Sequence, residues 1–160
     1  GQGFAIAMEG LDGGRINIAT CSVGTAQRAI QDATAYVQER KQFDTAIADF
    51  QNTQFRLADM LTELVAARQM IRLAASNLDN NDPQATTYCA MAKRFATDVG
   101  FTVCNDALQL LGGYGYIKEY PMERYVRDTR VHQILEGTNE IMRVIVGRKL
   151  LMDGALEVIQ

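Results

Sequence analysis

Apolar residues recur at steps of three and four along most of the chain, the spacing typical of helices that bury one face. Three long stripes predict helices over about residues 15–40, 49–78 and 83–112. The stripes consist of Ala19, Val23, Ala26, Ile30, Ala33 and Val37, then Leu57, Leu61, Leu64, Ala67, Ile71, Ala74 and Leu78, and then Tyr88, Ala92, Phe95, Val99, Val103, Ala107 and Leu110. Helices of this length extend roughly 37–45 Å and are expected to pack as antiparallel neighbours.

Polar and glycine-containing segments mark the ends of these helices. The polar pair Lys41–Gln42 ends the first, and a turn at residues 80–83 ends the second, with Pro83 suited to the first turn of the third. Gly112-Gly113 closes the third helix as a C-cap.

The remaining residues complete the expected fold. Residues 114–138 interleave aromatic and charged side chains, with a short helix near residues 122–129. A last helix over about residues 139–152 carries Ile141, Val144, Ile145 and Leu151 on one side, and only residues 1–7 are predicted as a strand end. The pattern therefore predicts an all-α fold, an antiparallel four-helix bundle that forms a single domain over residues 1–160.

Composition narrows the function. A length of 160 residues with 48% hydrophobic residues suits one domain, and a net charge of −3 argues against nucleic-acid binding. No apolar run approaches the roughly 20 residues of a membrane span. A single histidine, with Thr129 where a Glu-x-x-His pair needs Glu, argues against a metal cluster. The unpaired spacing of Cys21, Cys89 and Cys104 predicts reduced thiols that are buried or half-buried.

Three segments break the helical pattern before the last quarter of the chain. Asp12-Gly13-Gly14-Arg15 is expected to form a turn, which is either a helix cap or an anion or carbonyl site at a helix N-terminus. Arg40 beside Phe43 is either a solvated helix end or a phosphate site whose ring packs against a flat ligand. The glycines of residues 109–116 allow close backbone approach, although the strand and helix of a dinucleotide fingerprint do not flank them.

Glu136 is the fourth candidate, in a mostly apolar stretch before Gly137 and the last helix. A carboxylate there can stabilise the helix N-terminus by a few tenths to about 1 kcal/mol. In a partly desolvated pocket the same carboxylate can act as a general base, with its pKa raised toward the working pH. His132 is interpreted as a packing or hydrogen-bonding residue.

Together these segments resemble the C-terminal helical domain of the acyl-CoA dehydrogenases, over essentially the whole chain. The segments that match in order and spacing are Asp12-Gly13-Gly14-Arg15, Arg40-Lys41-Gln42-Phe43, Gln109-Leu110-Leu111-Gly112-Gly113-Tyr114-Gly115 and Leu135-Glu136-Gly137-Thr138-Asn139-Glu140-Ile141. The resemblance implies an enzyme that uses FAD to dehydrogenate an acyl-CoA thioester between its α and β carbons, giving a 2-enoyl-CoA. It also implies an upstream helical domain and a middle β domain, so this chain, which begins with Gly, is expected to be a fragment that is inactive alone.

The resemblance also assigns roles to residues. Glu136 is implied to take the α-proton while the β-hydride goes to the flavin N5, with its own backbone N–H donating to the thioester carbonyl. The residues implied to line the substrate are Asp12, Gly13, Gly14, Arg15 and Gly137. Those implied to reach the FAD of a neighbouring subunit are Arg40, Gln42, Phe43, Phe50, Gln51, Gln109, Leu110, Leu111, Gly112 and Gly113. Those implied to contact the FAD of the same subunit are Thr138, Asn139 and Glu140, where Glu140 replaces the Gln of other members.

Partners and substrate follow from the same resemblance. A shared FAD implies a dimer of dimers, and an electron-transfer flavoprotein is the expected electron acceptor. Leu135 and the surrounding residues 127–137 are most similar to the isobutyryl-CoA branch, which acts on short branched acyl-CoA. Such an enzyme serves fatty acid or branched-chain amino acid catabolism, in the cytoplasm of a bacterium or the mitochondrial matrix of a eukaryote.

Two other functions remain open at this point. One is a flavin oxidase or monooxygenase on the same fold, against which the presence of Glu136 in its motif argues. The other is a non-catalytic bundle that serves as an oligomerisation and FAD-sharing module.

Overall fold

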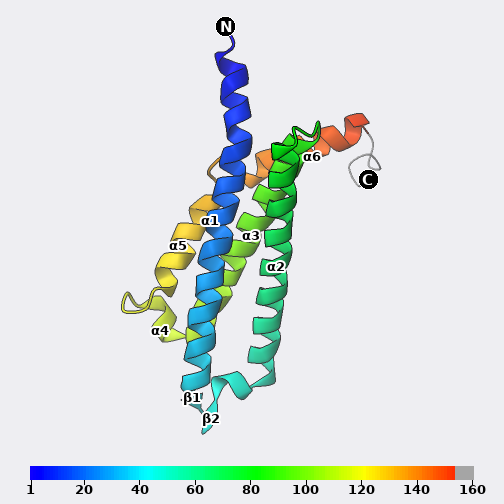
Figure 1. The fold of residues 1–160 in the computed structure, drawn as a ribbon. Coiled ribbons are helices and arrows are strands. Elements are labelled where there is room, and N and C mark those ends of the chain that lie inside the picture. Colours follow the sequence, from blue (N-terminus) through cyan, green and yellow to red (C-terminus); the bar gives the residue numbers. More distant parts are fainter. Residues whose placement is uncertain (154–160) are drawn as a thin grey trace.

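Three long antiparallel helices dominate the computed structural model, which describes residues 1–153 (Figure 1). These are α1 (Gly3–Glu39), α2 (Gln51–Asp79) and α3 (Ala85–Leu111). The hairpin of β1 (Lys41–Gln42) and β2 (Thr45–Ala46) and the 3-10 helix η1 (Ile47–Asp49) join α1 to α2. After α3 come α4 (Gly113–Tyr116), α5 (Met122–His132) and α6 (Asn139–Asp153). The all-α prediction is confirmed, and residues 154–160 of the predicted domain lie outside the described residues.

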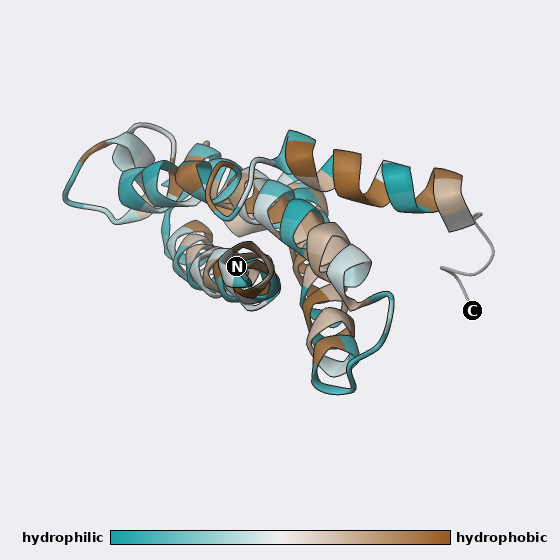
Figure 2. Ribbon diagram, turned by 90° about the horizontal axis from the view of Figure 1, so that it is seen from above, coloured by the Kyte–Doolittle hydropathy of each residue, from teal (hydrophilic) through white to brown (hydrophobic). Residues whose placement is uncertain are grey.

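α3 is the central helix, since it packs against α1, α2, α5 and α6. Small side chains fill its contacts: Ala92, Ala96 and Ala107 are fully buried, and Gly100 lies against Ser22 of α1. α5 runs back along α1 and α3 and forms the fourth antiparallel member, whereas α6 extends away from the long helices (Figures 1 and 2). The fold therefore places the link between α5 and α6 beside α1 and α3.

Most residues of the first and third stripes are buried or half-buried, as predicted. In the second stripe Leu61 is 54% exposed, because Met60 takes the inward position one residue earlier. In α6 the predicted apolar side does not face the core: Ile141, Val144 and Leu151 are exposed, and Met142 is fully buried instead. The reason is that α6 packs on α3 and then leaves the bundle.

The N-terminal prediction is wrong. Residues 3–15 belong to α1, so neither the strand end at residues 1–7 nor the turn at Asp12-Gly13-Gly14-Arg15 forms. Ala5, Ala7 and Met8 favour a helix, and the two strands of the described residues pair with each other and not with this segment. The helix continues across Gly13 and Gly14 because helical residues flank them on both sides. Each glycine nevertheless destabilises the helix by roughly 0.5–1 kcal/mol relative to alanine.

The other helix ends are close to those predicted. Gly112 ends α3 at φ +57°, a conformation that favours glycine, and its N–H donates to the Gln109 carbonyl. α3 begins two residues after Pro83, where the Asp82 carboxylate accepts a hydrogen bond from the Gln84 N–H at 2.7 Å. The proline thus precedes the helix and does not occupy its first turn.

The cysteines are free thiols, as predicted. Cys89 and Cys104 are buried, and burial raises the pKa of their thiols to about 11 and about 12. Cys21 is exposed, which corrects the prediction for that residue. It lies on the side of α1 opposite to the packed residues Ala19 and Val23.

Candidate functional site

Glu136 occupies a tight turn between α5 and α6. Its φ is +56° and that of Gly137 is +90°, so two consecutive residues adopt the left-handed region. The turn is closed at its base by a hydrogen bond from the Asn139 N–H to the Gln133 carbonyl at 3.0 Å. Such a conformation is costly for a residue with a Cβ and persists where its surroundings determine it.

The Glu136 side chain reaches across to α1. A Cβ placed on Gly14 would lie 2.7 Å from the Glu136 carboxyl carbon and 3.2 Å from Oε1. Only a glycine at position 14 therefore leaves the carboxylate where it lies. Two segments that are far apart in the sequence, each singled out above, meet at this contact.

Next to Gly14, a buried ion pair within α1 is linked to α3 by a hydrogen bond from Thr86. Arg15 donates to the Asp12 carboxylate at 2.6 Å, and the Thr86 hydroxyl donates to the other carboxylate oxygen at 2.6 Å. Asp12 and Arg15 are both buried, and the Arg15 Nε has no hydrogen-bond partner among residues 1–153. The pair therefore contains a buried donor that the described residues leave unsatisfied.

Behind the turn lies a buried polar network centred on Lys93 of α3. The Lys93 ammonium donates to the Gly137 carbonyl and to Asn139 Oδ1, each at 2.8 Å. Asn139 in turn donates to Thr97 at 2.9 Å and to Asp98 at 2.7 Å. Burial lowers the pKa of the Lys93 ammonium to about 8, against the carboxylates of Asp98, Glu140 and Glu136, which raise it.

His132 lies outside this network, as a half-buried residue that hydrogen-bonds to α1. Its Nδ1 lies 2.7 Å from the hydroxyl of Ser22, which is fully buried in α1. Burial lowers the pKa of the imidazole. The contact fixes the end of α5 against α1 just before the Glu136 turn.

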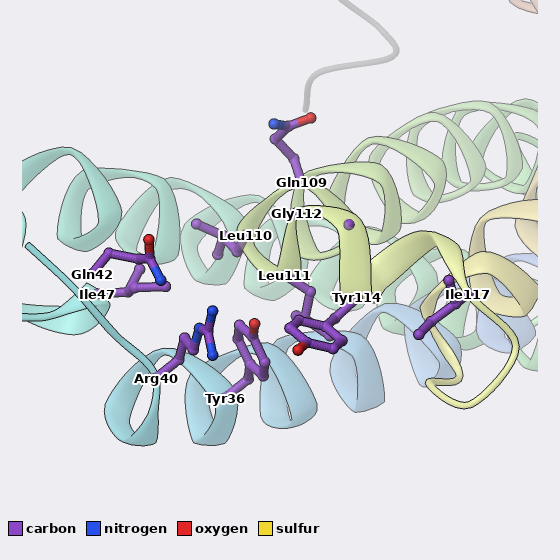
Figure 3. A pocket seen from close by; sticks show the side chains of 11 residues that line it. Tyr36, Arg40, Gln42, Ile47, Gln109, Leu110, Leu111, Gly112, Tyr114 and Ile117 are labelled. Carbon is purple, nitrogen blue, oxygen red and sulfur yellow. The ribbon is translucent and has the colours of Figure 1, made fainter.

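A separate cavity of about 590 Å³ lies at the other end of the bundle (Figure 3). It lies between the end of α3 on one side and the end of α1 with the β-hairpin on the other. Its lining includes Arg40, Gln42, Leu110, Leu111, Gly112 and Gly113. The Arg40 guanidinium lies over the Tyr114 ring at 5.5 Å, a cation–π contact that holds its charge at the cavity. A Cβ on Gly112 or Gly113 would meet nothing within 4 Å, so their backbone is open to close approach.

The residues expected to reach a shared FAD are only partly gathered here. Gln109 belongs to the lining but its side chain points away from the other labelled residues in Figure 3. Phe43, Phe50 and Gln51 are not among the lining residues, and the Phe43 side chain is 90% exposed.

The residues expected to contact FAD in the same subunit have different surroundings. Thr138 accepts a hydrogen bond from the Ile141 N–H at 3.4 Å, and Asn139 is buried in the Lys93 network. Glu140 is exposed, and its own backbone N–H and the Thr138 hydroxyl lower the pKa of its carboxyl. The Asn139 side chain is therefore used in hydrogen bonds that hold the Glu136 turn against α3.

The two groups of residues are far apart within one chain. At 1.5 Å per helical residue, the stretch of α1 from Gly14 to Tyr36 spans roughly 33 Å. The Glu136 turn and the cavity at Tyr36 and Arg40 therefore cannot surround the same reacting atoms in a single copy of this chain.

Sequence reasoning missed Lys93 and its partners Thr97 and Asp98. The available signal was the run of small residues that flanks Lys93, with Ala92 before it and Ala96 after it. A helix with small residues on every side is buried, and a lysine inside such a helix must be paired.

Two structural features are absent within the described part of the chain. No helix within residues 1–153 is long and apolar enough to cross a membrane. No cluster of histidine, cysteine and carboxylate side chains there could hold a metal ion.

Comparison with known proteins is consistent across sequence and structure. Residues 1–151 match the family model for the acyl-CoA dehydrogenase C-terminal domain. The chain is 56% identical over 153 residues to the mitochondrial isobutyryl-CoA dehydrogenase of Bos taurus, covering 96% of this chain and 37% of that protein. It thus spans less than two fifths of the length of this relative.

Two solved structures share the fold. Butyryl-CoA dehydrogenase from Megasphaera elsdenii superposes with a TM-score of 0.92 at 44% identity, over 94% of this chain and 39% of that chain. The second is a chain in a structure of the electron transferring flavoprotein of Acidaminococcus fermentans, from work on flavin-based electron bifurcation. It superposes with a TM-score of 0.92 at 47% identity, over 95% of this chain and 40% of that chain.

Proposed function

Since this chain belongs to the acyl-CoA dehydrogenase family, as its C-terminal domain, we propose that it supplies the base for dehydrogenation of an acyl-CoA thioester. In the whole enzyme Glu136 removes the α-proton of the substrate. The observation that carries this proposal is the contact of the Glu136 carboxylate with Gly14, which fixes the base against α1 beside Arg15.

The turn also supplies a donor for the substrate. Within residues 1–153 the Glu136 N–H donates to no backbone carbonyl, so it is free to donate to the thioester oxygen. The α-proton of a thioester is only weakly acidic, and negative charge develops on that oxygen as the proton leaves. A donor that is already in place stabilises that charge without reorganisation.

Arg15 and Asp12 are proposed to hold the reacting end of the substrate. Thr86 and Arg15 together use both oxygens of the Asp12 carboxylate, and this fixes the guanidinium in one orientation. The unused Arg15 Nε–H can then donate a hydrogen bond to a polar atom of the substrate. Gly13 and Gly137 add no bulk on either side, which allows a thioester to lie against the Glu136 turn.

The cavity at the other end fits the nucleotide half of FAD. Its open glycine backbone, the Arg40 cation and the apolar Leu110 and Ile47 suit a phosphate next to a flat ring. FAD supplies the hydride acceptor for the β-hydrogen when it is bound. Because this cavity is distant from Glu136, we propose that Arg40, Gln42 and residues 109–113 serve the FAD of a neighbouring copy, in a dimer of dimers.

Substrate, partner and location are proposed from the relatives. The identity to an isobutyryl-CoA dehydrogenase favours a short branched acyl-CoA. An electron-transfer flavoprotein is the proposed electron acceptor, since one relative is named as a subunit of the caffeyl-CoA reductase–Etf complex of Acetobacterium woodii. The proposed compartment is the mitochondrial matrix or the bacterial cytoplasm, according to the source.

The test is anaerobic flavin bleaching by the full-length protein with a panel of straight and branched acyl-CoA substrates. Glu136→Gln should still bind FAD and acyl-CoA but lose bleaching by several orders of magnitude, because an amide cannot take the α-proton. Glu63→Gln, the same change at an exposed position of α2, is the matched control and should bleach normally. Normal bleaching by Glu136→Gln would overturn the assignment, and rapid oxygen consumption by the wild type would favour a flavin oxidase.

A further inference from the structure

A buried lysine faces the backbone of the Glu136 turn, not its side chain. Lys93 is fully buried, and its ammonium donates to the carbonyl of Gly137 at 2.8 Å. The second acceptor, Asn139 Oδ1, belongs to the residue that begins α6. A single side chain from α3 thus holds both the turn and the start of the helix that follows it.

The turn needs such support because of its backbone conformation. Glu136 has a Cβ and a φ of +56°, so the left-handed region is unfavourable for it. Hydrogen bonds to a charged donor are stronger than neutral ones, especially in a buried site. The bond to the Gly137 carbonyl fixes the peptide plane between Gly137 and Thr138, and so the far side of the two-residue turn that Glu136 begins.

Other contacts keep the ammonium in place. Asn139 cannot turn away, since its amide also donates to Thr97 and Asp98. Asp98 accepts a further hydrogen bond from Gln133 at 2.8 Å, and the Gln133 carbonyl closes the base of the turn. The network therefore binds both ends of the segment 133–139 to α3, through Gln133 at one end and Asn139 at the other.

We propose that Lys93 is a positioning residue that fixes the Glu136–Gly137 turn through the Gly137 carbonyl, and thereby the place of the Glu136 carboxylate and N–H. It touches no reacting atom. This inference rests on the proposed function, in which Glu136 is the base.

The test compares full-length Lys93→Met, Lys93→Gln and wild type. Met is close to Lys in volume and removes the donor, which leaves two buried acceptors unpaired at a cost of about 1–3 kcal/mol each. Gln retains a shorter amide donor and should give an intermediate effect. Thr129→Val is the matched control, because Thr129 is a fully buried hydroxyl whose partners, in α5 and at the Cys104 thiol of α3, all lie outside the Glu136 turn.

Two measurements are made on each protein. In the protein without substrate, hydrogen–deuterium exchange of the amides at residues 133–139 should be about tenfold or more faster in Lys93→Met, because a charge-assisted bond is lost. In bleaching experiments the limiting rate should fall by about 100-fold, the scale expected for a displacement of about 1 Å, with KM nearly unchanged. Thr129→Val should change neither.

The outcomes separate this inference from the proposed function. Unchanged exchange in Lys93→Met and Lys93→Gln would show that Lys93 does not hold the turn. Faster exchange with an unchanged limiting rate would show that the turn is held but that its position does not matter, which also overturns the inference. If Glu136→Gln bleaches normally while exchange is faster in Lys93→Met, the proposed function fails and the structural role of Lys93 stands.

Discussion

Gly14→Ala is expected to impair catalysis while leaving the fold intact. The new Cβ would lie 2.7 Å from the Glu136 carboxyl carbon, whereas ordinary contact begins at 3.4 Å, so the carboxylate must retreat by at least 0.7 Å. A displacement of about 1 Å can cost about 100-fold in rate. The carboxylate ends a flexible side chain, so the backbone need not move.

The free energy of unfolding of Gly14→Ala should stay the same or rise, although its activity falls. Alanine is favoured over glycine inside a helix by roughly 0.5–1 kcal/mol, and position 14 lies within α1. Gly24→Ala is the matched control: it lies in the same helix, and its Cβ would meet nothing within 4 Å. Both variants should therefore keep or raise the free energy of unfolding, and only Gly14→Ala should lose activity.

The assay is stopped-flow bleaching of the full-length enzyme, with urea unfolding in parallel. A limiting rate for Gly14→Ala equal to that of Gly24→Ala would refute the view that the carboxylate position is set by this contact. A loss of several kcal/mol in Gly14→Ala would show that the backbone, and not the carboxylate, meets the new methyl group.

Three further predictions concern pH, the glycine turn and the isolated domain. Burial lowers the pKa of Lys93 from 10.5 to about 8, so the unfolded chain binds this proton more tightly than the folded protein does. Between pH 8 and pH 10.5 the free energy of unfolding of the wild type, measured by urea titration, should therefore rise by roughly 3 kcal/mol relative to that of Lys93→Met. A difference between the two proteins that does not change with pH would contradict this. Gly112→Ala should cost about 1–3 kcal/mol of stability, because φ is +57° with ψ −133° there, and should weaken FAD retention; unchanged melting would count against it. The 160-residue domain should retain negligible FAD after desalting, and a stoichiometric yellow protein would disprove that expectation.

Helical periodicity was enough to predict the long helices because each buries a continuous face. The stripe of Ala19, Val23 and Ala26 is buried as expected. Periodicity failed for α6, where Ile141 and Val144 are exposed, because a spacing pattern says that residues share a side but not that another element covers it. It also failed at Asp12, where helix formers on both sides outweigh the turn preference of the two glycines.

The candidate site was only partly predictable for a related reason. Glu136 and Arg40 stand out in sequence because they break a pattern. The small residues around Lys93 could indicate only that it is buried and paired, because its role depends on which backbone carbonyl lies across from it, and that is fixed by the packing of α3 against the turn. Likewise, the contact of Gly14 with Glu136 depends on how α1 packs beside the link between α5 and α6.

The central claim is that Glu136 removes the α-proton, and proton exchange measures this step apart from hydride transfer. A CoA thioester with sulfur in place of the β-carbon keeps an acidic α-proton but cannot transfer a β-hydride. In D2O the full-length wild type should exchange the α-hydrogen of this compound for deuterium, followed by mass spectrometry. Glu136→Gln should slow the exchange by several orders of magnitude while it still binds the compound. Exchange at the wild-type rate in Glu136→Gln would contradict the claim.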